Sequence, residues 1–257
     1  MSCLATDVNA EVFTWTQNHE KADSLLNFFF DGQLNDDVKD ELFELFKNIS
    51  EQIVAWQPKV VGLSLFSYVS QHSTKWLAWF LKKADPSLTI IIGGAGCLPT
   101  FTGPSEFAKD LIDKGLIDYH IRGDGEHALY EFLKGQRDYI GINSLEWREL
   151  PMEEMRNLPM PDYSNYKFNL YAKKVLPLVG SRGCVRKCTF CDYIANWKQF
   201  NWRTADDIFT EMQKQYKTYG IRYFKFQDSL TNGNMKEFVK LTEMLSDYNQ
   251  QNPDESF

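Results

Sequence analysis

The sequence predicts an α/β protein built from two successive series of strands and helices. Short apolar, β-branched runs alternate with amphipathic helical patterns from about residue 36 to 134, and again from residue 175 onward. Each run is short and apolar on both faces, which is typical of parallel strands covered by helices on both sides. The 257 residues, 43% of them hydrophobic, are enough to form two modest cores.

The first series is predicted to contain three strands, each followed by a helix. It opens with a helix from Asp36, whose apolar residues recur at three- and four-residue spacing until Pro58. The later elements are strand 59–65, helix 73–83, strand 88–92, helix 104–114, strand 116–121 and helix 126–134. Ligands of such sheets bind beyond the carboxyl ends of the strands, here in the loops 64–70, 93–100 and 122–126.

A segment with three prolines, 136–174, interrupts this alternation and is predicted to be a linker. It divides the chain into a parallel-sheet domain over 1–135 and a second α/β series over 175–257. The second series is predicted as strand 175–180, helix 204–219, strand 222–227 and helix 235–248.

Composition excludes several classes of protein. The net charge of −7 argues against non-specific nucleic-acid binding. Apolar runs stay well below the length of about 18 residues that a membrane helix needs, so no membrane partner is expected. Five cysteines are too few for a disulfide scaffold, and their odd number indicates a reducing compartment. With no secretory signal pattern at the start of the sequence, a cytoplasmic protein is expected.

Three cysteines form a C-x3-C-x2-C motif directly after the strand predicted at 175–180. Cys184, Cys188 and Cys191 lie within the sequence SRGCVRKCTFCDY, on a predicted loop. Three thiolates at this spacing can bind three irons of a [4Fe–4S] cluster and leave the fourth iron without a protein ligand. The basic residues between and before them favour the thiolate form.

Two other kinds of metal site also use closely spaced cysteines, but with different patterns. Structural zinc sites use paired C-x2-C units and a fourth Cys or His, which is not found nearby. Ferredoxin-type clusters use a C-x2-C-x2-C run with a fourth cysteine, whereas Cys97 and Cys3 lie in other elements. Three cysteines that bind no metal are the remaining alternative.

The C-x3-C-x-F-C pattern after a first barrel strand resembles the motif of radical S-adenosylmethionine enzymes. Phe190 is the aromatic residue before the last cysteine, and DSLTNGN after the next strand extends the similarity. The resemblance implies that 175–257 is the first part of a radical-SAM (β/α) barrel. It also implies that S-adenosylmethionine binds the open iron. One electron from a flavodoxin- or ferredoxin-type reductant would then give a 5′-deoxyadenosyl radical, which abstracts hydrogen from a substrate that these residues do not specify.

In that family, residues after the second strand lie near the amino group of S-adenosylmethionine. Asp228 and Ser229 occupy this position here, where many members carry Gly-Gly-Glu. The resemblance therefore implies a cofactor contact for both residues. A solvent-facing helix N-cap is the alternative for Asp228.

The order VVGLSL, IIIGGAG, IDYHIRGDGEHAL resembles the Rossmann-like cobalamin-binding domain that is often fused to radical enzymes. Ser64 would hydrogen-bond the cofactor, while Gly93 and Gly94 would let its tail approach the backbone. Glycines that follow strands are also ordinary turn residues. If cobalamin binds, the family chemistry is methyl transfer to an unactivated carbon or a radical rearrangement.

Two other motifs in this domain are predicted to be coincidental. Asp118 to Gly123 spells D-x-H-x-x-G, but it follows the Ser and Gly-Gly elements instead of preceding them, so His120 is expected to be an ordinary strand residue. The run from Gly123 to Ala128 imitates a dinucleotide fingerprint, but its two carboxylates would repel a pyrophosphate.

The length indicates a partial member of the family. A complete eight-unit barrel takes about 250 residues, whereas two strand–helix units follow residue 175. The expected function is that of a radical S-adenosylmethionine protein. The alternative is a non-catalytic iron–sulfur or cobalamin-binding module.

Overall fold

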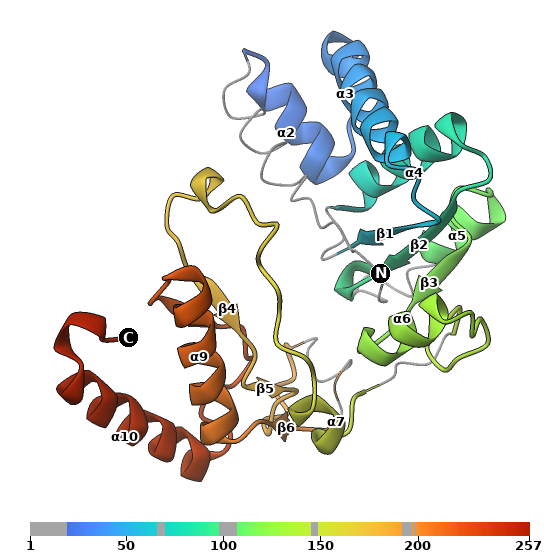
Figure 1. Cartoon of the computed structure of the whole chain (residues 1–257). Coiled ribbons are helices and arrows are strands. Elements are labelled where there is room, and N and C mark those ends of the chain that lie inside the picture. Colours follow the sequence, from blue (N-terminus) through green and yellow to red (C-terminus); the bar gives the residue numbers. More distant parts are fainter. Residues whose placement is uncertain (1–19, 66–69, 98–106, 145–148, 192–196, 198) are drawn as a thin grey trace. The chain divides into compact units, whose positions relative to one another are not determined.

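The computed structural model describes residues 20–65, 70–97, 107–144, 149–191, 197 and 199–257. These residues form two compact units that meet in sequence between residues 144 and 149. The α/β fold class predicted from the sequence is confirmed (Figure 1).

A parallel three-stranded sheet forms the centre of the N-terminal unit. Its strands are β1 (Val60–Ser64), β2 (Thr89–Gly93) and β3 (Tyr119–Ile121), in the order β1-β2-β3. Both pairs are parallel, and Ser64 lies opposite Gly93 in the register. The strands predicted at 59–65 and 88–92 are thus confirmed to within a residue or two.

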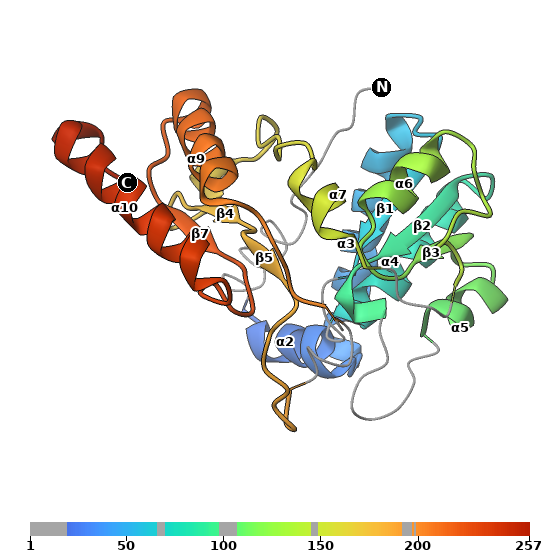
Figure 2. The same ribbon diagram turned by 90° about the horizontal axis from the view of Figure 1, so that it is seen from below.

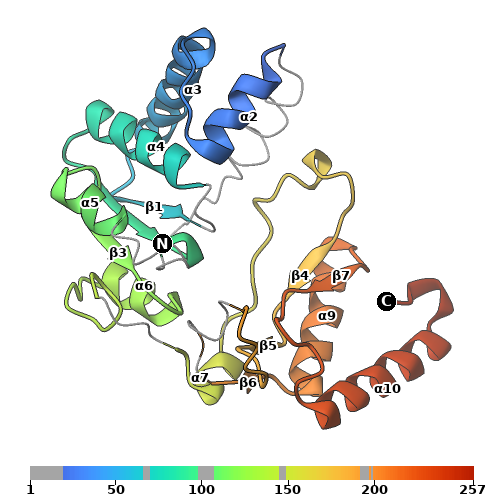
Figure 3. The same ribbon diagram turned by 180° about the vertical axis from the view of Figure 1, so that it is seen from behind.

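Helices cover both faces of this sheet. Alternate residues of β2 point to opposite sides, so each set packs against different helices. Ile90 and Ile92 pack with residues of α4 (Gln71–Ala84) and α5 (Phe107–Asp113). Ile91 packs on the other face with Phe132 of α6 (Glu126–Leu133). Figure 3 shows α4 and α6 on opposite sides of the strands.

A further helical layer lies outside α4. It consists of α2 (Ala22–Asp31) and α3 (Asp36–Ala55), which begins within one residue of the predicted start and has Asn35 as its N-cap. The layer is held by an apolar cluster that includes Leu25 and Phe28 of α2, Leu42 and Phe46 of α3 and Phe80 of α4.

Strand β3 is shorter than the predicted strand 116–121, for a reason that lies in the preceding helix. Gly115 adopts a left-handed conformation (φ 65°) after α5. The backbone N–H groups of Leu116 and Ile117 then both donate to Leu111 O, which ends the helix. Ile117 is still buried in the core, but its backbone is not available for the strand ladder.

The second unit contains a strand–helix–strand motif followed by one more helix. Strand β4 (Leu176–Leu178) pairs in parallel with β7 (Phe224–Phe226), and α9 (Ala205–Tyr219) connects them. The last long helix, α10 (Met235–Gln251), packs beside α9, as Figure 2 shows. Leu178, Ile208, Met212 and Leu241 join these elements in one apolar cluster.

The segment predicted as a linker contributes to both units: Ile142 packs with Ile121 in the N-terminal unit, and the residues from 149 onward belong to the second unit. It includes α7 (Met152–Arg156) and a short 3-10 helix, η3 (Phe168–Leu170). Leu150 and Met155 are buried, and Tyr163 packs against Leu176 of β4. This part of the segment therefore contributes to the core of the second unit. Of the helices that the structure describes, none has the length and apolar character needed to cross a membrane.

Two adjacent glycines at the end of β2 should respond differently to replacement by alanine. Gly94 has φ 114°, and a Cβ there would lie 2.5 Å from Leu65 O, whereas a Cβ at Gly93 would meet Ile121 at an ordinary 3.7 Å. We expect Gly94→Ala to lower the free energy of unfolding by at least about 2 kcal/mol. Gly93→Ala should change it by less than about 1 kcal/mol. Denaturant unfolding of the two variants measures the difference. Equal decreases in the free energy of unfolding would contradict the close approach of Gly94 to Leu65 O.

Candidate functional site

The cysteine loop leaves and returns on a short antiparallel ladder. Strand β5 (Ser181–Arg182) pairs with β6 (Asn201–Trp202), so that Ser181 lies opposite Trp202. Gly183 begins the loop with φ 79°, and a Cβ there would clash with Gln199 O. No other residue type fits at this position without moving the returning strand.

The three cysteines of the motif are accessible free thiols. Cys184, Cys188 and Cys191 are all partly exposed and form no disulfide. The N–H of Cys191 donates to Cys188 O at 3.1 Å, and the N–H of Arg186 donates to Cys184 Sγ at 3.4 Å. The loop therefore turns twice within the motif. Phe190 is 82% exposed beside the last cysteine.

The donor set fits an iron–sulfur cluster, although the thiols are not assembled into a site. Within the described ranges, no three His, Cys, Asp or Glu side chains lie close enough together to hold a metal ion. Three accessible thiols within eight residues are nevertheless the ligand type and number that an open [4Fe–4S] cluster requires. Residues 192–196, which follow the last cysteine, lie outside the described residues.

Asp228 binds the backbone at the end of the neighbouring strand. Its Oδ1 accepts a hydrogen bond from the N–H of Gly180 at 2.8 Å. Burial raises the pKa of the carboxyl group, and the hydrogen bonds from Ser181 and Gly180 partly oppose this shift. Next to it, Ser229 is exposed. A cavity of about 20 Å³ lined in part by Asp228 has room for one water molecule.

The alternative that Asp228 is a solvent-facing helix N-cap is wrong. The N-cap of α10 is Asn234, whose Oδ1 accepts from Glu237 N at 3.3 Å. Asp228 lies six residues earlier in the chain and contacts the end of β4 instead. Sequence proximity to a helix suggested the cap, but the donor that Asp228 binds is the N–H of Gly180, between β4 and β5.

The residues predicted to contact cobalamin lie together at the carboxyl end of the N-terminal sheet. Ser64 is exposed at the end of β1, and Gly93 is its partner on β2. Gly94 then lets the chain cross Leu65 closely, so that the N–H of Gly96 donates to Leu65 O at 2.8 Å. The glycines therefore have a structural role in this crossing. The loop residues 66–69 and 98–100 lie outside the described residues.

His120 is an ordinary strand residue, as predicted. It lies in β3 and is 5% exposed. Its N–H donates to Asn143 Oδ1 at 2.8 Å, and its carbonyl oxygen accepts from the N–H of Asn143 at 2.8 Å. Burial lowers the pKa of its imidazole, with a smaller contribution from Arg122. Cys97, in the 3-10 helix η2 (Ala95–Cys97), is also buried, and burial raises the pKa of its thiol to about 12.

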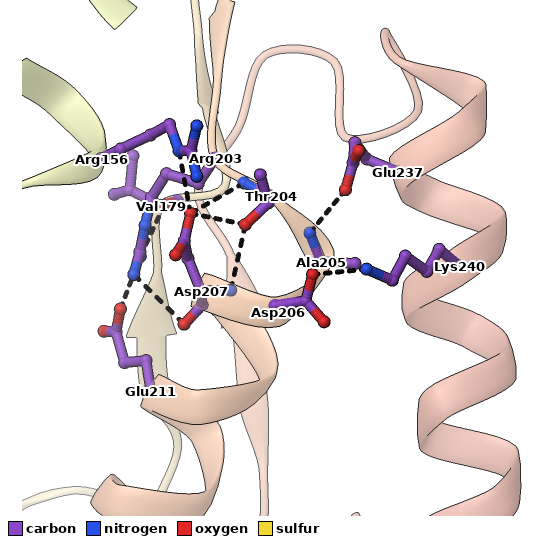
Figure 4. A network of polar contacts seen from close by, with 10 residues as sticks. All are labelled: Arg156, Val179, Arg203, Thr204, Ala205, Asp206, Asp207, Glu211, Glu237 and Lys240. Carbon is purple, nitrogen blue, oxygen red and sulfur yellow. Dashed lines mark hydrogen bonds and ion pairs between the residues drawn. The ribbon is translucent and has the colours of Figure 1, made fainter. Parts of the chain in front are cut away.

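Sequence reasoning missed a buried ion pair behind the cysteine loop. Arg203 Nη1 lies 2.5 Å from Glu211 Oε2, and their side chains are 14% and 4% exposed. Arg203 Nη1 also donates to Val179 O at 3.3 Å (Figure 4). The signal was present in the sequence, because Glu211 falls on the buried stripe of α9 formed by Ala205, Ile208, Met212 and Gln215.

The raised pKa of Asp228 predicts a pH-dependent stability. An acid whose pKa is raised on folding stabilises the protein below its unfolded pKa and loses that contribution as pH rises through the folded value. Asp228→Asn removes the charge but retains an acceptor for Gly180 N. We therefore expect the stability of this variant relative to the wild type to increase from about pH 4 toward pH 7. Unfolding in denaturant across this range measures it, and a constant difference would contradict an Asp228 carboxyl group with a raised pKa.

Comparison with known proteins gives distant relatives along most of the chain. No protein-family model matches the chain. It is 24% identical over 197 residues to the anaerobic magnesium-protoporphyrin IX monomethyl ester cyclase of Synechocystis, covering 70% of this chain and 38% of that protein. The corresponding cyclase of Cereibacter sphaeroides is 22% identical, covering 77% and 35%. A cytidylyl-2-hydroxyethylphosphonate methyltransferase of Streptomyces wedmorensis is 26% identical, covering 68% and 40%.

The chain thus spans 35–40% of the length of these curated relatives. A solved structure with a similar fold is the radical S-adenosylmethionine methyltransferase TsrM of Kitasatospora setae, with cobalamin and a [4Fe–4S] cluster bound. The TM-score is 0.59 at 16% identity, covering 82% of this chain and 44% of that one. Over about 70–80% of its length, the chain is a distant homologue of the cobalamin-binding class of radical S-adenosylmethionine enzymes.

Proposed function

We propose that this chain is a radical S-adenosylmethionine protein whose cluster is held by Cys184, Cys188 and Cys191. One observation carries the proposal: three accessible free thiols lie within eight residues of one loop, which follows a parallel strand. The distant homology to enzymes of this class supports it. A [4Fe–4S] cluster bound there would supply the electron, received from a reductant, for cleavage of S-adenosylmethionine to methionine and a 5′-deoxyadenosyl radical.

The residues of this chain would bind and orient the cofactors. The three thiols would lose their protons on binding iron and would leave one iron position open. Asp228 accepts hydrogen bonds from Gly180 and Ser181, and its carboxylate would use its remaining acceptor capacity for the amino group of S-adenosylmethionine. Ser229 is exposed beside it as a second hydrogen-bonding group. Phe190 offers an exposed apolar face beside the cysteines, which would cover the cofactor and exclude water.

Cobalamin is the second cofactor that we propose, at the carboxyl end of the N-terminal sheet. The exposed hydroxyl of Ser64 lies opposite Gly93, so a ligand can approach both strand ends there. His120 would not supply an axial ligand, because it is buried within β3. With cobalamin, the chemistry of the class is methyl transfer to carbon or a rearrangement. A flavodoxin- or ferredoxin-type protein would deliver the electron, and the free thiols suit the reducing cytoplasm.

A non-catalytic cluster-binding module is the second candidate. Gln227, Asp228 and Ser229 stand where many family members carry Gly-Gly-Glu, and Asp228 already binds a backbone N–H. In such a module the cluster would form, but S-adenosylmethionine would not be cleaved.

Anaerobic reconstitution with iron and sulfide separates these candidates. We expect the wild type to take up about four irons and four sulfides per chain and, with dithionite, to release 5′-deoxyadenosine from S-adenosylmethionine. The triple variant of Cys184, Cys188 and Cys191 to Ala should lose both properties. Cys97→Ala is the matched control, because that buried thiol should not bind iron.

The outcomes of this experiment are distinct. A cluster without 5′-deoxyadenosine favours the non-catalytic module. A wild type that binds no cluster, or a triple variant that retains it, contradicts both candidates. Iron and sulfide analysis and mass spectrometry of the nucleoside provide the two readouts.

Cobalamin binding can be measured by visible absorption after incubation and desalting. We expect the wild type to retain the cobalamin bands. Loss of one hydrogen bond in Ser64→Ala should weaken binding about two- to tenfold. Ser87→Ala is the control, because Ser87 is exposed at the opposite end of β2 and bonds to Asp85. Absence of the bands in the wild type, or equal affinity in both variants, would contradict this site.

A further inference from the structure

The cysteine loop leaves the rest of the unit after one short stretch of backbone, Val179 to Ser181. This stretch joins β4 to β5, the strand from which the loop leaves. At its returning end, Asn201 Nδ2 donates to Leu150 O at 3.0 Å and the N–H of Gln199 donates to Glu149 Oε2 at 3.1 Å. The returning strand β6 leads directly into Arg203. Both ends of the loop are therefore fixed within a few residues of the same place.

Groups from other elements bind several polar atoms of this stretch. The N–H of Arg203 donates to Gly180 O at 2.8 Å, and its guanidinium donates to Val179 O at 3.3 Å. From the segment after β7, Asp228 accepts from Gly180 N at 2.8 Å. Ser181 Oγ donates to Leu230 O at 3.2 Å. The position of the loop thus depends on contacts that lie outside the loop.

The ion pair between Arg203 and Glu211 orients one side of this attachment. A guanidinium presents its donors in a fixed plane, so one side chain can bind several acceptors in a set geometry. Arg203 uses Nη1 for Val179 O and Glu211 Oε2, and Nη2 approaches Asp207 O at 3.5 Å. It therefore connects the end of β4 with the first turns of α9.

Burial of this ion pair carries a large desolvation free energy, so the pair is a weak source of stability for the fold. Removing two charges from water costs free energy that apolar residues of the same volume would not require. The nearby pair Lys240–Asp206 joins α10 to α9 on the surface, where the two side chains are 47% and 60% exposed. Figure 4 shows the buried and the exposed pair in the same network. The buried pair differs in that it bonds to the backbone that carries the loop.

The helix that supplies Glu211 is itself fixed at its start. Thr204 and Asp207 form a reciprocal capping box at the N-terminus of α9. The N–H of Ala205 donates to Glu237 of α10 at 2.8 Å. Glu211 therefore reaches Arg203 from a helix whose first turn is held by both its own cap and its neighbour.

We propose that Arg203 and Glu211 are positioning residues for the cluster loop, because their buried pair fixes the backbone at which the loop leaves and returns. The proposal rests on the proposed cluster site for its functional meaning. Its structural part, the fixing of the two loop ends, can be tested in the chain without iron.

The test compares the double variant Arg203→Met/Glu211→Leu with the exposed-pair control Asp206→Ala/Lys240→Ala. The apolar double variant removes both members of the buried ion pair together, so we expect it to fold. In the iron-free chain, hydrogen exchange of peptides covering 179–183 and 200–204 should be about tenfold faster or more than in the wild type. Exchange in the second half of α9 should be unchanged, and the control should behave as the wild type.

After reconstitution, iron release to a chelator should be about tenfold faster or more in the double variant, as for other residues that orient metal ligands. Unchanged exchange at both loop ends, or iron release at the wild-type rate, would overturn the proposal. Equal effects in the exposed-pair control would also overturn it. If the wild type binds no cluster, the proposed function fails, while the exchange experiment still decides the positioning role.

Arg203→Lys keeps the test decisive if the double variant does not fold. Lysine retains the charge for Glu211 but lacks the planar set of donors that also reaches Val179 O. We expect intermediate exchange rates at 179–183, with a melting temperature close to that of the wild type. Exchange and iron release equal to those of the wild type would contradict a role for the guanidinium geometry.

Discussion

The backbone from Val179 to Ser181 is the constraint on which the candidate site depends. Gly180 donates to Asp228 and accepts from the N–H of Arg203, so both backbone polar groups of this one residue are bound by other elements. A side chain at Gly180 would meet Asp228 Oδ2 at 3.0 Å, and the absence of one lets the carboxylate approach. The cysteine loop, the parallel pair β4–β7 and the start of α9 all meet at this place. A change there alters the geometry of all three together.

A glycine also permits a close backbone approach at the carboxyl end of the N-terminal sheet. Gly94 allows the backbone after β2 to pass Leu65, and hydrogen bonds from Leu65 to Gly93 and from Gly96 to Leu65 join the two strand ends. In both units, then, a glycine permits a close approach directly where a parallel strand ends. Because strand ends are also where ligands approach such sheets, the same glycines satisfy a folding requirement and leave open surface for a cofactor.

The sequence predicted most elements because their signals are local. Periodic apolar residues predicted α9 and α10 to within a few residues, and cysteine spacing predicted the loop. The parts that failed depend on contacts between distant residues. Leu116 and Ile117 close a helix instead of extending β3. Asp228 binds a backbone N–H 48 residues away, which no side-chain pattern reveals. Glu211 was visible as a charge on an apolar stripe, but its partner could be identified only from the fold.

Burial distinguishes Cys97 from the three loop cysteines, and that difference supports the cluster site. Cys97 is enclosed beside the sheet, where desolvation raises its pKa to about 12 and keeps the thiol protonated. Iron binds thiolate, so such a cysteine competes poorly for the metal. The three loop cysteines have no comparable enclosure and lie beside basic residues. Among the cysteines that the structure describes, one buried thiol and three accessible ones at a fixed spacing thus agree with the proposal that iron binds at a single loop. The remaining requirement is to hold that loop in place, which is the role we assign to the charges behind it.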